Sequence, residues 1–430
     1  MERKKMIGLG MTFAMLIGMT ACQQEEIVSS LNPDVVINLP DKLKGARVEQ
    51  DTLTFINQSS GLTVKVPATG KLSLPDGLYN CFYKASVTYT EAGYEQKGML
   101  RGGLESITVD KTHLSFTMDV HLILDKNDFL IEEIFFTGTL RESGKQYNGD
   151  SYVKLYNNTD HVLYADGLAF VESEFVSTDK YDYQPDIRKD TMSVHAIYVV
   201  PGDGKKYPVK PGESIVLCDT GIDHRVANPN SFDLSKADFE WYDVSSSPNH
   251  MDIDGETVEN LDKWYCYTKS FFVLHNRGFR AYAVARIPVD KDSYLRDFFY
   301  TYEYLLSTPQ GNFPMSQTAY KLPNNWIVDG VNCSLETEWK WNILPATIDG
   351  GWTHCGKIDH DQNRYFKSVR RKMIALDEHG KRILKDTNNS TEDFNADCVP
   401  SLIEEQGTAI SADGKKAEKR TYDGVQPIVE

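Results

Sequence analysis

Short segments in which apolar and polar residues alternate recur along this chain and set its fold class. Alternation with a period of two places successive side chains on opposite faces of a half-buried strand. Such strand-like segments lie at residues 35–39, 52–56, 62–66, 85–90, 106–109, 113–124, 131–136 and 152–160. Short strands at this spacing are typical of β-sandwiches. The sequence therefore predicts a mainly β fold.

A turn motif gives the first strands a closer resemblance. In Pro75-Asp76-Gly77, proline presets its own φ and glycine accepts a positive φ, so the three residues favour a tight turn. With Leu78 and Tyr79 they form a loose version of the "pGxY" turn. The segment resembles immunoglobulin-like modules of the Cna-B or carboxypeptidase-regulatory sort. That resemblance implies an Ig-like β-sandwich over residues 34–125.

The N-terminus carries an export signal. Arg3, Lys4 and Lys5 precede an almost uncharged apolar run, which ends in small residues and Cys22. This order is typical of a secretory signal peptide, and the run is shorter than the ~20 apolar residues that a membrane-spanning helix needs. A cysteine directly after the cut site resembles a bacterial lipoprotein signal. The resemblance implies cleavage after residue 21 and lipid attachment at Cys22, with residues 22–33 as a tether.

The residues after Cys22 indicate on which side of the outer membrane the protein is displayed. Gln23, Gln24, Glu25 and Glu26 resemble the acidic export signal of surface lipoproteins in Bacteroides-type bacteria. We therefore expect an outer-membrane lipoprotein displayed on the cell surface, with the periplasmic leaflet as the alternative.

A second set of motifs points to another β-domain. Residues 152–160 (YVKLYNNTD) resemble the first strand of lamin-tail-like domains, although Lys154 replaces the usual acidic residue. Further matches to that fold follow in the same order at residues 165–168, 209–217, 233–239, 368–372 and 386–394. The resemblance implies a lamin-tail-like β-sandwich over residues 126–400, with a partly helical insertion near 240–320.

Two further stretches narrow the resemblance. Residues 276–282 (NRGFRAY) and 320–332 (YKLPNNWIVDGVN) are similar to a group of Bacteroides-type lipoproteins of unknown function, DUF4876. This group implies an architecture and a cellular address, and it has no agreed biochemical activity.

The insertion holds the main helical candidate. Asp290 is a candidate N-cap, and Tyr294, Leu295, Phe298, Phe299, Tyr302 and Leu305 recur at about i, i+3 and i+4. This spacing predicts an amphipathic helix that ends before Thr308-Pro309. The polar residues 401–430 predict a poorly packed tail.

Composition limits the class of ligand. The chain has a formal net charge of −16, which argues against nucleic acid, whose phosphates require Lys and Arg. The six cysteines other than Cys22 are widely spaced and contain no C-x-x-C pair. They are either disulfide partners or isolated core residues. The absence of a C-x-x-C pair argues against a zinc ribbon or a thioredoxin-like site, and we expect no cofactor.

One polar cluster is a candidate metal site. His354, Asp359, His360 and Asp361 are competent metal ligands close in sequence, although their spacing fits no established motif. A solvated loop is the alternative. Because the chain contains no G-x-S-x-G, H-E-x-x-H or P-loop motif, the sequence favours a protein that is not an enzyme. A hydrolase remains the third hypothesis.

Aromatic residues form the candidate binding surface. Trp326, Trp339, Trp341 and Trp352 are close in sequence, and Trp339 and Trp341 would share one face of a strand. Such a face can stack on a sugar or anchor a protein partner, and packing in the core is the alternative. Thr52 and Thr191 lie in D-[ST]-hydrophobic sequences, which resemble O-glycosylation sites of exported proteins in these bacteria.

These observations give a first hypothesis and an alternative. The first is a non-catalytic surface lipoprotein that binds an outer-membrane partner; by analogy with such lipoproteins, that partner is a TonB-dependent transporter. The alternative is a ligand-capture protein for metal complexes or glycans that uses residues 320–365.

Overall fold

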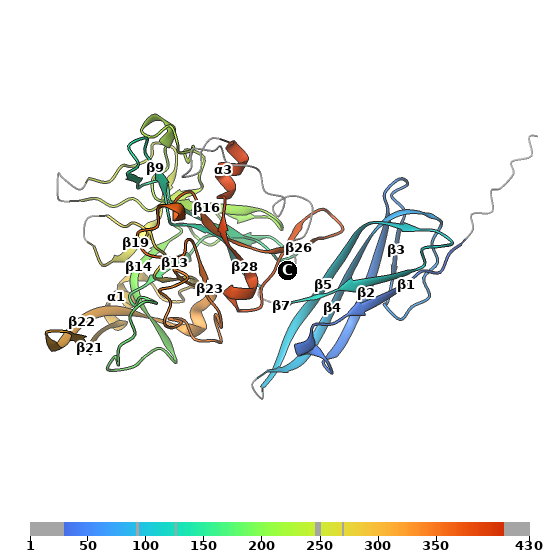
Figure 1. The fold of residues 1–430 in the computed structure, drawn as a ribbon, viewed down its shortest axis with the longest axis horizontal. Coiled ribbons are helices and arrows are strands. Elements are labelled where there is room, and N and C mark those ends of the chain that lie inside the picture. The colour runs from blue at the N-terminus through green and yellow to red at the C-terminus, as the bar shows by residue number, and fades with distance from the viewer. Residues whose placement is uncertain (1–29, 92–93, 125–126, 246–250, 269–270, 408–430) are drawn as a thin grey trace, which may run out of the picture.

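The fold is mainly β, as the sequence predicts, and comprises two β-sandwiches (Figure 1). The computed structural model describes residues 30–91, 94–124, 127–245, 251–268 and 271–407. Cys22, the predicted signal peptide and residues 408–430 lie outside the described residues. No helix within the described ranges is long and apolar enough to cross a membrane.

The N-terminal sandwich packs a five-stranded sheet against a pair of parallel strands. The sheet has the order β3 (Thr63–Val66), β2 (Arg47–Asn57), β4 (Gly77–Glu91), β5 (Tyr94–Val109) and β7 (His121–Leu124). The pair is β1 (Asp34–Asn38) and β6 (Ser115–Asp119), with η1 (Asp41–Leu43) after β1. Phe55, Tyr79, Leu100 and Met118 are fully buried between them. The Tyr79 hydroxyl donates to the Pro75 carbonyl at 3.0 Å, which closes the predicted turn.

The larger sandwich contains a seven-stranded and an eight-stranded sheet. The first has the order β18 (Glu259–Asn260), β17 (Phe239–Glu240), β16 (Ser214–Cys218), β11 (Tyr152–Tyr156), β8 (Leu130–Phe135), β25 (Ser368–Arg371) and β28 (Phe394–Cys398). The second has the order β21 (Phe299–Thr308), β22 (Gly311–Pro323), β14 (Thr191–Val199), β13 (Leu168–Ser173), β20 (Ala281–Arg286), β23 (Ile327–Ser334) and β24 (Thr353–His354). β19 (Asp262–Cys266) also pairs with β14.

Short elements connect these strands. They are the ribbons β9 (Thr139–Leu140) with β10 (Gln146–Tyr147), β12 (Leu163–Tyr164) with β15 (Pro208–Val209), and β26 (Met373–Leu376) with β27 (Arg382–Leu384); the helices α1 (Lys291–Asp297), α2 (Ser390–Asp393) and α3 (Ser401–Gln406); and the 3-10 turns η2 (His224–Val226), η4 (Asn324–Trp326) and η5 (Gln362–Arg364).

The eight-stranded sheet is buried on both faces. One face meets the seven-stranded sheet, where Val153 and Leu155 pack in one core with Phe170 and Tyr282. The other face forms a second core that includes Tyr294 of α1. This double burial covers the central strands β13 and β20, in which every residue except Arg286 is buried.

The predicted helix over residues 290–305 is much shorter than expected. Asp290 caps α1 as predicted and accepts from the Ser293 N–H at 3.0 Å, but the helix ends at Asp297. Phe299–Thr308 is instead strand β21, which pairs along its whole length with β22. The helix prediction was wrong because the aromatic residues after Phe298 also alternate with a period of two, and long-range pairing determined the outcome.

The predicted tail also begins too early. Residues 401–406 form α3, whose Ile403 is fully buried. Glu404 is buried with it, because the Arg370 guanidinium lies 2.7 Å away and compensates its charge. Residues 401–406 are therefore part of the packed domain, although they are polar, because Arg370 compensates the buried charge of Glu404.

The described cysteines are isolated core residues. Cys81, Cys218, Cys266, Cys333, Cys355 and Cys398 are all buried and free of disulfides. Of the two alternatives that the sequence leaves open, the structure supports packing.

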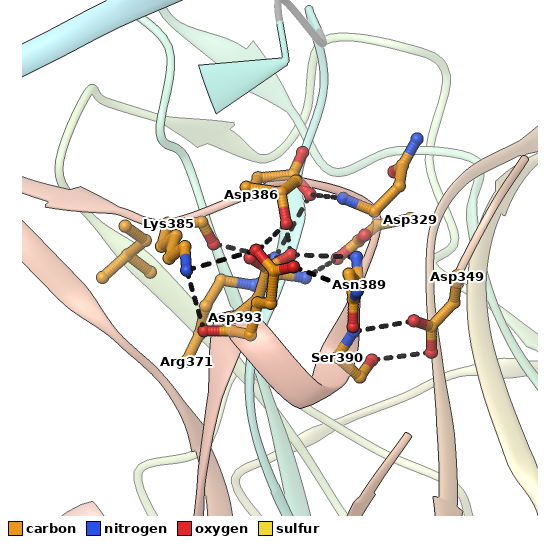
Figure 2. A network of polar contacts seen from close by, with 12 residues as sticks. Asp329, Asp349, Arg371, Lys385, Asp386, Asn389, Ser390 and Asp393 are labelled. Atoms are coloured by element: carbon orange, nitrogen blue, oxygen red, sulfur yellow. Dashed lines mark hydrogen bonds and ion pairs between the residues drawn. The ribbon is translucent and has the colours of Figure 1, made fainter. Parts of the chain in front are cut away.

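A buried ion-pair network joins the two sheets of the larger sandwich (Figure 2). Arg371 on β25 is 2.6 Å from Asp329, which lies on β23 of the opposite sheet. Asp386 and Asp393 approach the same guanidinium at 3.3 and 3.7 Å. Burial opposes the charge on Arg371, but the three carboxylates outweigh it and raise the pKa of the guanidinium. One cation therefore holds together two sheets and the segment that leads into α2.

Asp349 extends this polar interior to a neighbouring loop. Its carboxylate accepts the Asn332 N–H at 2.6 Å and the Ser390 N–H at 2.7 Å. It also accepts the Ser390 hydroxyl at 2.6 Å, as Figure 2 shows. The loop, β23 and α2 are thus fixed through one side chain.

We expect Arg371→Ala to lower the free energy of unfolding of the larger domain by about 3–5 kcal/mol, because three buried carboxylates would lose their counter-charge. The exposed pair between Arg225 and Asp223 is the control, and Arg225→Ala should cost less than about 1 kcal/mol. Urea unfolding followed by tryptophan fluorescence measures both, since all six tryptophans lie in the larger domain. Equal losses in the two variants would contradict a central role for Arg371.

Candidate functional site

The four candidate tryptophans do not form one surface. Trp341 is buried, and its indole N–H donates to the carbonyls of Val176 and Asp179 at 3.0 and 3.1 Å. Trp326 packs its ring on Phe298, with centroids 5.0 Å apart. The expectation that Trp339 and Trp341 share a strand face is wrong, because both follow β23 in irregular structure.

Trp339 and Trp352 do come together at the surface. Their rings are nearly parallel, at 7°, with centroids 5.4 Å apart. Trp339 is 39% exposed, and its indole N–H is held by Asn342 at 2.9 Å. The His354 ring lies 5.6 Å from Trp352. These three rings form a small aromatic ledge, which can stack on a flat ligand or a sugar ring.

The candidate metal ligands are engaged in separate contacts. The His354 ring contacts the Gly356 carbonyl at 3.1 Å, and Asp361 accepts the Asn363 N–H at 2.8 Å at the start of η5. Asp359 pairs with Arg277 at 2.5 Å, and the exposed His360 lies 3.3 Å from the same carboxylate. Among the residues that the structure describes, no group of three or more His, Cys, Asp or Glu side chains is placed to hold a metal ion.

The two candidate glycosylation residues occupy different environments. Thr52 is half-buried on β2 and lines a cavity of about 320 Å³ between the sandwiches, together with Arg101 and Glu378. Thr191 begins β14, and its hydroxyl donates to the Ile187 carbonyl at 3.1 Å. The hydroxyl of Thr191 is therefore already used within the fold.

The largest aromatic group surrounds the β21–β22 hairpin, which lies at one end of the molecule (Figure 1). Tyr300, Tyr302 and Tyr304 follow one another along one face of β21, with centroids 5.7 and 6.1 Å apart. The rings of Tyr181 and Tyr183 add to this row at 4.7 and 5.6 Å from Tyr304. We call Tyr181, Tyr183, Tyr300, Tyr302 and Tyr304 the tyrosine row.

A carboxylate anchors the inner part of this row. Glu174 accepts the Tyr302 hydroxyl at 3.0 Å and lies 2.9 Å from the His195 ring. Burial, together with the charge of Glu174, raises the pKa of Tyr302, so that its phenol stays neutral. The inner part of the row is therefore fixed within the fold, where the hydroxyls of Tyr300 and Tyr302 already donate to Ser193 and Glu174.

The outer edge of β21 is largely unpaired. β21 is the terminal strand of its sheet, and within the described residues it bridges on that side to Gln184 alone, opposite Glu303. The two residues exchange backbone bonds of 2.8 and 2.9 Å. Beside this bridge a groove of about 380 Å³ opens, lined by Asp182, Gln184, Glu303, Tyr304, Leu305, Pro314, Met315 and Ser316.

Large apolar side chains of the hairpin are exposed. Leu305 and Phe313, on the two strands of the hairpin, are 51% and 46% exposed. An exposed apolar strand edge is a hazard for aggregation unless a partner covers it. The hairpin is therefore the described surface best suited to a macromolecular partner.

This site was not predicted from the sequence, because the spacing of the same residues indicated a helix. The signal was present in residues 300–304 (YTYEY), where tyrosines alternate with polar residues. The partner strand begins after the turn at Pro309 and Gln310, and that hairpin would have supplied the missing evidence.

Two comparisons with known proteins find a likeness to the same family. A family model described as a protein of unknown function (DUF4876) matches residues 210–401, which confirms the predicted resemblance over that part. The crystal structure of a DUF4876 family protein from Bacteroides thetaiotaomicron VPI-5482 is similar over 89% of this chain and 98% of that chain, with a TM-score of 0.57 and 20% sequence identity. At this identity the likeness concerns the fold. A comparison with curated proteins finds no match.

Proposed function

We propose that this protein is a non-catalytic lipoprotein of the bacterial outer membrane, displayed on the cell surface. It binds an outer-membrane protein partner through the β21–β22 hairpin. The observation that carries the proposal is the unpaired, partly apolar edge of β21 beside a groove. The partner is a TonB-dependent transporter, by analogy with the lipoproteins that the sequence resembles. The N-terminal and larger sandwiches correspond in this proposal to the Ig-like and lamin-tail-like modules.

The proposed anchor is tested by labelling cells with an alkyne fatty acid. We expect the protein to incorporate the label and the Cys22→Ala variant to lose it, because Cys22 carries the proposed lipid. Cys398→Ala is the control, since that thiol lies in the folded domain and should not affect labelling. Label retained by Cys22→Ala would reject the anchor.

The partner surface is tested by photo-crosslinking in intact cells. A benzoylphenylalanine at position 313 should give a discrete adduct with one outer-membrane protein, because Phe313 is an exposed side chain of the hairpin. The control position is Val226, which is apolar and 90% exposed but lies on η2. Mass spectrometry identifies the adduct. The same background at both positions would reject the accessory function.

Glycan capture is a second candidate function, favoured by the stacked pair of Trp339 and Trp352. Affinity electrophoresis in gels that contain starch, xylan or arabinan tests it. We expect retardation in one gel and its loss in Trp339→Ala, because that ring supplies the exposed stacking surface. Tyr267→Ala, which removes an exposed aromatic ring elsewhere, should migrate like the unmodified protein. Unretarded migration in every gel, or equal effects of both variants, would remove this candidate.

A further inference from the structure

We propose that the outer edge of β21 binds an extended segment of the partner protein as an added strand, and that this segment carries a Lys or Arg side chain which enters the adjacent groove. The inference rests on the proposed function and specifies how the hairpin recognises its partner.

Every second residue of β21 directs its backbone groups away from β22. In an antiparallel hairpin, alternate residues direct their N–H and C=O groups toward the two sides of a strand. Glu303 directs these groups outward, since it bonds to Gln184 on that side. Leu305 and Ser307 share this parity, so their backbone groups also face outward.

The outer side of β21 is open beyond the bridge at Glu303. Continuing the antiparallel register from the bridge of Gln184 and Glu303 would place Asp182 opposite Leu305. The structure shows no backbone hydrogen bond between these two described residues, and the groove lies at this point. The chain thus leaves β21 after one bridge, and an added strand can continue the ladder from Leu305 toward the hairpin turn.

The groove beside β21 is acidic. The residues that line the groove include the two carboxylates of Asp182 and Glu303 and no basic side chain. Both carboxylates are exposed, and the charge of Asp182 acts on the nearby Arg188, which is itself paired with Asp186 at 2.5 Å. A cationic side chain would satisfy them, and its aliphatic stem would pack on Leu305, Pro314 and Met315.

The ring of Tyr304 completes the recognition of a cation. It lines the groove together with both carboxylates, and an aromatic face attracts Lys or Arg electrostatically. The same charges disfavour a second copy of this chain as the occupant. Pairing of two β21 edges would bring the acidic residues of both copies together, and like charges on paired strands are destabilising.

The test uses the full mature chain and a phage library of random twelve-residue peptides. We expect enriched peptides with alternating apolar residues and at least one Lys or Arg. Their binding is then compared between Leu305→Pro and Leu305→Ala. Proline removes an outward N–H that the fold does not use, and it is tolerated on edge strands. Leu305→Ala removes the side-chain contact but keeps the N–H, so Leu305→Pro should weaken binding at least tenfold more than Leu305→Ala does.

A second measurement covers the case in which Leu305→Pro fails to fold. In the unmodified protein, hydrogen exchange at the amides of Leu305 and Ser307 should slow when an enriched peptide binds. Failure to enrich any peptide, equal binding by the proline and unmodified proteins, or unprotected amides in the complex would each overturn strand addition. Enriched peptides without basic residues would overturn the recognition of a cation.

The outcomes also separate this inference from the proposed function. A crosslink at position 313 that persists in Leu305→Pro would keep the partner surface and reject strand addition. A dimer of this chain that Leu305→Pro disrupts would show that a second copy occupies the edge, which also rejects the inference. Peptide binding at the edge without any crosslink in cells would reject the accessory function alone.

Discussion

The larger sandwich depends on one buried charge. A guanidinium shielded from water is costly unless anions surround it, and Arg371 obtains them from β23, from the chain after β27 and from α2. Its Nε also donates to the Ile131 carbonyl at 2.8 Å, and its Cζ lies 4.6 Å from the centre of the Phe394 ring. These contacts come from β8, from β23 and from the segment that runs from the end of β27 through α2 into β28. Only one arrangement of the two sheets therefore gives the Arg371 guanidinium all of its counter-charges, whereas apolar contacts alone would tolerate several arrangements.

The same network explains why residues 386–394 contain so many polar side chains. Asp393 accepts the Thr387 N–H at 2.7 Å, and Asn389 caps α2 through the Thr391 N–H at 3.1 Å. The segment closes on itself, and it presents Asp386 and Asp393 to the cation. The burial of Asp386 and Asp393 indicates that this segment holds the fold together.

The sequence was informative wherever local pattern and long-range structure agree. The alternation of residues 152–156 predicts β11, and Asp290 was identified as a helix cap, because both depend on neighbours in the chain. The hairpin was misassigned because residues 294–305 fit a helical and a strand period at once, and the choice depended on pairing with β22. The four tryptophans illustrate a further limit. They are close in sequence, but one is in the core and two stack at the surface, which only the path of the chain after β23 determines.

The pairing of the first described residues has a consequence for how far the protein extends from a membrane. Leu31 already bonds to Leu74 at 2.7 Å, so the folded body begins nine residues after Cys22. Fully extended, nine residues span at most about 30 Å. With the proposed lipid at Cys22, the N-terminal sandwich is held close to the bilayer. The hairpin lies at the opposite end of the long axis from β1 (Figure 1). A membrane partner that binds the hairpin must therefore project well beyond the lipid head groups, unless this protein lies flat along the membrane surface.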